Sequence, residues 1–376
     1  MAYTASDLTR RFNLGRTLLS PYPAANQALV GLTLSGPGRT LNLPFPADLK
    51  PKPATGQVGN PNDPLPTADV VVLTYTSDEA KALADVMSPG KFSHDWTHYA
   101  HNYKTFLPNI RKGAPSRMAG RLGSYWTTSV GGKSILLFKS ELHLHQDVFL
   151  KNGKPTMPIK DLFHQIIDEA KPGHFFCIGT AGGTCPDRPL GTVAASRAVR
   201  FICKKDFAKE KFANAQFQSN WTVPTTFRAQ ALSLMKAFMD NLVVQSAGNY
   251  ASCPCHALQG GNDRPPKPTF LLDGAGGVPK DFPVLTTDFF EFGTDRNHLE
   301  KLGLAVEMDD AVFGLACSEL AAPPKWLSIR NYSDPVINAA LKPRAQESCA
   351  AKIYLRYGYW TSVMGAIGTW SIIAGL

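Results

Sequence analysis

The sequence lacks the features that mark several whole classes of protein. Its seven cysteines are odd in number and scattered, which excludes a disulfide framework and favours a reducing compartment, the cytoplasm. Charged residues form only 18% of the chain and hydrophobic residues 44%, so it is too apolar to be disordered. It shows no collagen or coiled-coil pattern and no internal repeat. What remains is a globular protein, and 376 residues allow one large domain or two.

Both ends of the chain lack the marks of export or membrane anchoring. The N-terminal stretch has no apolar core followed by a small-residue cleavage site, so it predicts an amphipathic helix with Arg10, Arg11 and Arg16 on its polar side. Residues 357–376 carry no charge and are long enough to span a bilayer. Their glycines and hydroxyl residues lower the hydropathy, and no charge follows them. We therefore expect a buried terminal helix and no membrane contact.

Common phosphate-binding and metal-binding motifs are also missing. The segment 179–183, Gly-Thr-Ala-Gly-Gly, has neither the Lys-Ser/Thr of a P-loop nor the spacing of a dinucleotide fingerprint. Its amides could bind an anion at a helix start, and a tight strand-to-helix turn explains the glycines equally well. No carboxylate or cysteine completes a ligand set around His94, His98 and His101, and the segment 253–256 lacks a second ligand pair. The sequence predicts no metal site.

Proline and basic residues are what the sequence has in excess. Ten of its 29 prolines fall within residues 21–66, which denies that stretch both helices and central strands. We expect an N-terminal arm over 1–66 and one domain over 67–376, with insertions near 88–128 and 245–281. The 39 Lys+Arg and 30 Asp+Glu give a net charge of +9, which favours anionic partners. No recognised nucleic-acid module is present, so we expect no nucleic-acid partner.

Apolar runs and helix-start signals alternate from residue 68 onward. Helices are predicted from Ser77, over 159–170 and after 306–311. Strands are predicted at 69–74, 134–139, 174–178, 193–201, 282–286 and 325–330. This alternation predicts an α/β fold, a mixed, mostly parallel twisted sheet flanked by helices. Ligands of such folds bind at the carboxyl ends of the strands.

The order of the motifs within this alternation is more specific than any one of them. In sequence come Thr74-Tyr-Thr-Ser-Asp-Glu79, the glycine-rich segment 179–183, Asp288-Phe-Phe-Glu291, Val306-Glu-Met-Asp309 and Arg330-Asn-Tyr-Ser-Asp334. This set resembles the purine nucleoside phosphorylase superfamily, and most closely its hydrolytic branch, the methylthioadenosine/S-adenosylhomocysteine nucleosidases. The resemblance covers about residues 68–372 without the two insertions, and it implies a nucleoside phosphorylase-like three-layer fold.

The resemblance also implies a role for each matched residue. Asp334, oriented by Ser333, would protonate the purine at N7, and Glu79, with Asp78 as the alternative, would position the attacking water. Two carboxylates facing one glycosidic bond are what such hydrolysis requires. The implied substrate contacts are Phe290 on the base, Glu307, Met308 and Asp309 on the ribose, and Thr180, Ala181 and Gly182 at the nucleophile.

Several departures from the family pattern keep alternatives open. Asp309 is one methylene shorter than the usual glutamate, and Pro335 follows Asp334, which a simple turn would also explain. Cys177 stands where one phosphorylase branch has an arginine, so water is favoured as nucleophile, although Arg197 or an insertion arginine could replace that cation. His143 and His145 stand where relatives have a glycine-rich segment.

The sequence therefore predicts a nucleosidase that hydrolyses the N-glycosidic bond of a purine nucleoside or nucleotide. The alternatives are a phosphate-dependent phosphorylase and a non-catalytic nucleoside-binding or storage protein. We expect no cofactor, with inorganic phosphate needed only by a phosphorylase. The resemblance implies a homo-oligomer, a dimer or larger.

Overall fold

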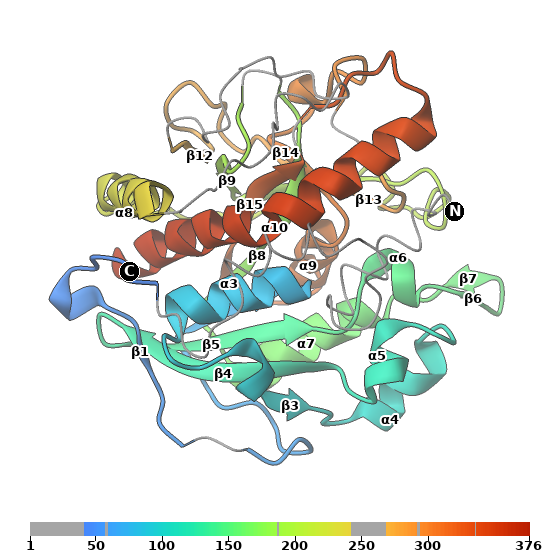
Figure 1. Ribbon diagram of the computed structural model, residues 1–376. Coiled ribbons are helices and arrows are strands. Elements are labelled where there is room, and N and C mark those ends of the chain that lie inside the picture. Colours follow the sequence, from blue (N-terminus) through green and yellow to red (C-terminus); the bar gives the residue numbers. More distant parts are fainter. Residues whose placement is uncertain (1–40, 57–58, 186–187, 242–267, 292–293, 335) are drawn as a thin grey trace, which may run out of the picture.

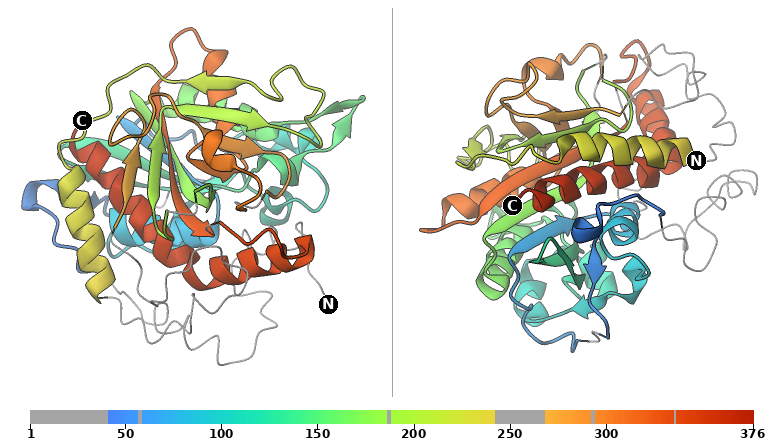
Figure 2. Two further views of the ribbon diagram at one scale, coloured as in Figure 1. Left: turned by 90° about the horizontal axis from the view of Figure 1, so that it is seen from above. Right: turned by 90° about the vertical axis from the view of Figure 1, so that its left-hand side faces the viewer.

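The computed structural model describes residues 41–56, 59–185, 188–241, 268–291, 294–334 and 336–376. The helix expected around Arg10 and Arg16 and most of the insertion expected at 245–281 lie outside these residues. Within them, one large sheet forms the centre and helices cover both of its faces (Figures 1 and 2). The predicted α/β class, a mixed sheet flanked by helices, is confirmed.

The main sheet has thirteen strands among the described residues, and parallel pairing joins its central ones. The order along the sheet is β1-β4-β5-β2-β8-β14-β13-β10-β11, with β15 pairing β8 and β9, β12 pairing β9, and β3 pairing β4. β5, β2, β8 and β15 run parallel, and so do β10, β13 and β14. The strands are β1 Lys52–Pro53, β2 Val70–Thr74, β3 Thr97–Tyr99, β4 Gly123–Val130, β5 Lys133–Ser140, β8 His174–Gly183, β9 Val193–Ser196, β10 Ala198–Ile202, β11 Gln216–Gln218, β12 Phe270–Leu272, β13 Val284–Thr287, β14 Ala305–Glu307 and β15 Lys325–Asp334.

Helices pack on both faces of this sheet, which gives three layers. The longer ones are α3 Ser77–Met87, α7 Pro158–Ala170, α8 Arg228–Asn241, α9 Asp310–Ser318 and α10 Pro343–Ala374. In β2, every residue is buried, and its side chains alternate between the layers. Val71 and Leu73 belong to the core shared with α7 and α9, whereas Val70 and Val72 belong to the core shared with α3, α8 and α10.

The uncharged C-terminal stretch is a buried helix, as predicted. α10 packs against α3, α8 and β15 and crosses the sheet in Figure 1. Gly365 permits this close packing, because a Cβ there would lie 2.6 Å from Oδ1 of Asn331. In the part of the chain that the structure describes, no helix is both long and apolar enough to cross a membrane.

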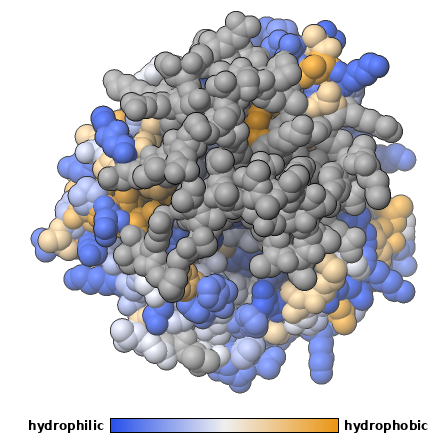
Figure 3. Space-filling model, viewed as in Figure 1, coloured by the Kyte–Doolittle hydropathy of each residue, from blue (hydrophilic) through white to orange (hydrophobic). Residues whose placement is uncertain are grey.

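Few large hydrophobic side chains of the described residues reach the surface. Met118, Leu150 and Leu302 are the exposed ones. The coloured surface along the lower edge of Figure 3 is mostly hydrophilic. Most large apolar side chains of the described helices are thus buried against the sheet.

The glycine-rich segment 179–183 is not the turn that the sequence predicted. It forms the second half of β8 and pairs with β15 on one side and β14 on the other. A Cβ on Gly179 would lie 2.7 Å from Nη1 of Arg330 and 2.8 Å from Oε1 of Glu79. The glycine is needed because two charged side chains approach the strand backbone, and no helix start is present there to bind an anion.

Three other elements differ from the expected bounds. The strand predicted at 193–201 breaks at Arg197 into β9 and β10, which pair with different strands. β15 continues past Arg330 to Asp334, with an irregularity in its register before Asp334. β4 begins within the insertion expected at 88–128 and runs to Val130, and it pairs with β5 along eight residues. The boundary at residues 66 and 67 remains a prediction.

Candidate active site

One pocket gathers nearly all the residues that the sequence predicted for the site. Its volume is about 110 Å³, and it lies beside the second halves of β8 and β15 and the segments that follow β2 and β14. Asp78, the alternative to Glu79, is not among its lining residues. The predicted residues that line it are Glu79, Thr180, Ala181, Gly182, Phe290, Glu307, Met308, Asp309, Ser333 and Asp334. Their roles remain predictions, but their proximity is a property of the fold.

Glu79 lies at the start of α3 and is saturated with hydrogen bonds. Its Oε2 accepts from Oγ1 of Thr74 at 2.9 Å and from the amides of Tyr75 and Thr76 at 3.0 and 2.8 Å. Its Oε1 accepts from the amide and the hydroxyl of Thr180 at 2.8 and 2.7 Å. Because it is the third helical residue, it also completes a capping box with Thr76. Five donors thus fix the carboxylate between β2 and β8.

Asp334, at the end of β15, is held much more sparsely. Its side chain is 8% exposed, and Ser333 Oγ donates to its Oδ1 at 2.8 Å. Burial raises the pKa of Asp334 to about 7, against a partial opposing effect of that hydrogen bond. Such a carboxyl group carries a proton near neutral pH and can donate it. Pro335, which raised the possibility of a simple turn, lies outside the described residues.

Glu307 and the residues after it form a buried, acidic wall of the pocket. Glu307 accepts from the amides of Asp309 and Asp310 at 2.6 and 3.0 Å, and so ties β14 to the start of α9. Burial and the charge of Asp310 raise the pKa of Glu307 to about 8, although Arg330 opposes this. Met308 lies between these residues in the pocket lining.

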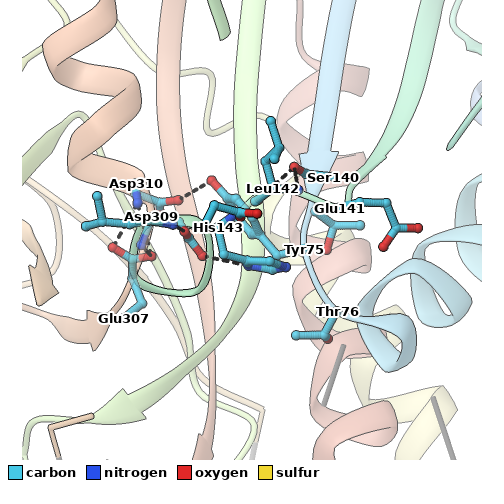
Figure 4. Close-up of polar contacts among 12 residues, drawn as sticks. Tyr75, Thr76, Ser140, Glu141, Leu142, His143, Glu307, Asp309 and Asp310 are labelled. Carbon is cyan, nitrogen blue, oxygen red and sulfur yellow. Dashed lines mark hydrogen bonds and ion pairs between the residues drawn. The ribbon is translucent and has the colours of Figure 1, made fainter. Parts of the chain in front are cut away.

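Asp309 is engaged by the chain segment that follows β5. Its Oδ1 accepts from the amide of Leu144 at 2.8 Å, and its Oδ2 lies 3.4 Å from Nδ1 of His143 (Figure 4). Burial opposes ionisation of Asp309, but the hydrogen bonds from His143 and from the amide of Leu144 lower the pKa of Asp309. The predicted sugar contact is therefore a carboxylate already committed to two protein groups.

Arg330 brings the permanent positive charge of the pocket, and acidic neighbours neutralise it. Its Nε donates to Oδ2 of Asp310 at 2.7 Å, its Nη2 also binds Asp310, and Nη2 lies 2.9 Å from Oε2 of Glu307. Tyr75 contacts the same pair, because its hydroxyl donates to Asp310 at 3.1 Å and its ring lies 5.1 Å from the guanidinium. These acidic neighbours raise the pKa of Arg330 despite its burial.

The other arginine considered for an anion lies elsewhere. Nε of Arg197 donates to Asp273 at 3.1 Å, and its Nη1 donates to the carbonyl of Trp221. It does not line the pocket, and Arg330 is the only lysine or arginine that does so among the described residues. The arrangement therefore provides no free cation for a phosphate dianion in the described lining.

Sequence reasoning assigned no role to three residues at this site: Tyr75 and Tyr354, which line the pocket, and Asp310, which does not line it but binds Arg330. Asp310 directly follows the matched Val-Glu-Met-Asp segment, and its repeated aspartate was the signal that could have revealed it. Tyr354 comes from α10, and its hydroxyl lies 3.0 Å from Oγ1 of Thr76. Tyr75 lies within the first motif but was not assigned a role. Packing of α10 over the pocket brings Tyr354 there from 278 positions away, and no local pattern indicates such a contact.

His94, His98 and His101 are not brought into the pocket. They lie in a short 3₁₀ turn, in β3 and in the turn after it, and Nδ1 of His101 pairs with Glu169 at 2.7 Å. Within the described ranges, no group of three or more histidine, cysteine, aspartate or glutamate side chains is arranged to hold a metal ion. His143 and His145, in contrast, both line the pocket.

Comparison with known proteins shows similarity in the backbone fold and not in the sequence. No model of a protein family matches the sequence, and no curated protein matches it. Among solved structures, the Helicobacter pylori 5′-methylthioadenosine/S-adenosyl homocysteine nucleosidase is 11% identical, with 83% of this chain and 100% of that chain covered and a TM-score of 0.45. Futalosine hydrolase of Helicobacter pylori is 10% identical, with 82% and 97% covered and a TM-score of 0.44. The Neisseria meningitidis nucleosidase in complex with methylthio-immucillin-A is 13% identical, with 82% and 100% covered and a TM-score of 0.43. At these values the comparison assigns no activity to this chain.

Proposed function

We propose that this protein is a nucleosidase, a divergent member of the purine nucleoside phosphorylase superfamily that releases a free base by hydrolysis. The observation that carries the proposal is one pocket lined by two carboxyl groups in opposite environments. Among the described residues, Asp334 is buried with one side-chain hydrogen bond, from Ser333, whereas Glu79 accepts five. Carboxyl groups whose surroundings differ in this way divide the acid and base roles of glycosyl hydrolysis.

Asp334 is the general acid of the proposed reaction. With its pKa near 7, it holds a proton at neutral pH and transfers it to a ring nitrogen of the base as the C–N bond breaks. The bonding electrons leave with the base, and the sugar becomes an oxocarbenium-like cation. The carboxylate of Asp309, whose pKa is lowered, lies in the same pocket and favours that positive charge.

Water reaches Glu79 through the hydroxyl of Thr180. Both oxygens of Glu79 already accept from protein donors, but Oγ1 of Thr180 donates to Oε1 at 2.7 Å and keeps lone pairs of its own. The attacking water gives its proton to this hydroxyl while the hydroxyl proton moves to Glu79. The water oxygen bonds to the sugar carbon, and proton exchange with solvent then resets Asp334 and Glu79.

The charge of the pocket supports water rather than phosphate as the nucleophile. Arg330 is bound by Asp310 and Glu307, and no second lysine or arginine of the described residues lines the pocket. A phosphate dianion would therefore meet the carboxylate of Asp309 without a free cation in the described lining. The same argument favours a nucleoside over a nucleotide as substrate, so the overall basic charge of the chain does not indicate a phosphorylated substrate.

Base release from a panel of ribonucleosides in phosphate-free buffer tests the proposal. We expect purified protein to release free base and free sugar, and added phosphate to leave the rate unchanged. Asp334→Asn should abolish release, whereas Asp63→Asn, an exposed aspartate outside the pocket, should not. The proposal fails if no member of the panel is cleaved, or if both variants lose activity equally.

A further inference from the structure

His143 and His145 bring ring nitrogens without protein partners to the wall of the pocket. Both residues line it, at the start of the short helix α6, Leu144–Asp147. Nε2 of His143 and Nδ1 of His145 are buried, and no described residue gives either atom a hydrogen bond. His143 as a whole is 3% exposed. A buried polar atom without a partner is costly, so each of these nitrogens indicates a group that the pocket receives.

The backbone of this segment is fixed from both sides. The amide of His143 donates to Oδ2 of Asp147 at 2.5 Å, and Oγ of Ser116 donates to Oδ1 of Asp147 at 3.2 Å. The next amide, that of Leu144, donates to Asp309 at 2.8 Å. The ring of His143 lies 5.9 Å from the ring of Tyr75. His143 is thus positioned by contacts that do not involve its own Nε2.

Asp309 determines which nitrogen of His143 carries the proton. A carboxylate can only accept, so Nδ1 of His143, 3.4 Å from Oδ2, is the donor of that pair. In a neutral ring with its proton on Nδ1, Nε2 keeps a lone pair and accepts a hydrogen bond. Burial lowers the pKa of His145 to about 4, so the ring of His145 is neutral at neutral pH. A neutral His143 therefore requires a ligand group that donates a hydrogen bond to its Nε2.

An uncharged hydroxyl group fits this requirement, and an anion does not. A phosphate or carboxylate would place acceptor oxygens against the lone pair of Nε2 and against the carboxylate of Asp309. A hydroxyl can donate to Nε2 and still accept from another group. Asp309 itself is one methylene shorter than glutamate, and its two oxygens already face Leu144 and His143.

We propose that His143 is a specificity-determining residue that accepts a hydrogen bond from one hydroxyl of the substrate's sugar. It extends the reach of the short Asp309 side chain, and the site selects nucleosides that retain this hydroxyl. The proposal rests on the proposed nucleoside site, and it does not depend on turnover.

Two substitutions of His143 separate the role of its Nδ1, which contacts Asp309, from the role of its Nε2, the proposed acceptor. His143→Asn keeps an amide nitrogen near the Nδ1 position, so the contact with Asp309 is retained while the Nε2 acceptor is lost. His143→Gln places an amide oxygen near the Nε2 position and restores an acceptor. His164→Asn is the matched control, because His164 lies on α7, does not line the pocket, and has its Nε2 within 3.1 Å of the carbonyl of Ala316.

The experiment measures dissociation constants of adenosine, inosine and their 2′-, 3′- and 5′-deoxy forms by calorimetry. Every protein carries Asp334→Asn, so that substrate is not consumed. With His143 present, we expect one deoxy form to bind about tenfold or more weakly than its parent, since one hydrogen bond is lost and Nε2 stays unpaired. His143→Asn should reduce that ratio to about twofold, His143→Gln should restore part of it, and His164→Asn should leave it unchanged.

Each other outcome is also decisive. The inference is overturned if the ratio survives in His143→Asn, if no deoxy form is discriminated when His143 is present, or if no nucleoside binds. If discrimination follows His143 but the protein with native Asp334 releases no base, the inference stands and the hydrolytic function fails. If base is released without discrimination, the function stands and the inference fails.

Discussion

The end of β15 and the start of α3 each bring one carboxyl group to the pocket, and the two are held in opposite ways. Asp334 follows an irregularity in a strand and, within the described part of the chain, its side chain receives one hydrogen bond, from the neighbouring Ser333. Glu79 stands at the third position of a helix, where backbone amides converge, and receives five. Local backbone geometry, rather than side-chain type, thus separates a buried carboxyl group with a raised pKa from a carboxylate fixed by backbone amides.

The largest expected effect is the loss of kcat when the carboxyl group of Asp334 is removed. Asp334→Asn cannot transfer a proton to the leaving base, so kcat for base release should fall by about 10³-fold. The fold should be retained, because only the bond from Ser333 is affected. Steady-state assays at pH 6 with circular dichroism as a folding check measure this. A loss below about tenfold would remove Asp334 from the acid role.

Substitution of Glu79, whose carboxylate accepts five hydrogen bonds, should lower both the stability and the activity of the protein. Glu79→Gln places an amide among five donors, so we expect a loss of at least about 2 kcal/mol in unfolding free energy and about 10²-fold in kcat. Asp78→Asn is the control, because Asp78 is adjacent in α3 and does not line the pocket. Chemical denaturation and base-release assays test both effects. Unchanged stability in Glu79→Gln would contradict the five hydrogen bonds.

The hydroxyl of Thr180 should matter less than either carboxyl group. Thr180→Val keeps the amide bond to Glu79 at 2.8 Å and removes the hydroxyl bond at 2.7 Å. We expect kcat to fall roughly 30-fold while Thr180→Ser stays within about threefold of native. Rapid-mixing assays of base release decide this. A Thr180→Val protein as active as Thr180→Ser would show that water reaches Glu79 without the hydroxyl.

The smallest expected effect is the pH dependence within one unit of neutrality. The acid must be protonated, so activity should be full below the pKa of Asp334, about 7, and fall as pH rises through it. From pH 7 to pH 8 the expected fall in kcat is about fivefold to tenfold. Profiles of kcat against pH in the native protein measure it. A profile that rises across this range would assign the limiting proton transfer to a base.

The fold was largely predictable because the signals are local. The apolar run of β2, the helix start at Ser77 and the amphipathic pattern of α7 each arise within one element. The glycines at 179–183 were misinterpreted, because the sequence does not show that Arg330 and Glu79 approach that backbone. β14 is only three residues long and carries too little pattern to be recognised.

The candidate site was predictable only where ordered motifs carried it. All the predicted pocket residues except Asp78 line one pocket. The contact between His143 and Asp309 joins positions 166 residues apart, and it changes what Asp309 can bind. The neutralisation of Arg330 by Asp310 depends on the packing of β15 against α9, so the sequence left the phosphate question open.

The identity of the sugar product tests the central claim most directly. A ribonucleoside is incubated with the protein in oxygen-18 water containing excess inorganic phosphate, and the sugar is analysed by mass spectrometry. Hydrolysis through Asp334 and Glu79 predicts free sugar that carries one oxygen-18 atom at the anomeric carbon and no sugar 1-phosphate. Sugar 1-phosphate as the main product would contradict it and make the protein a phosphorylase.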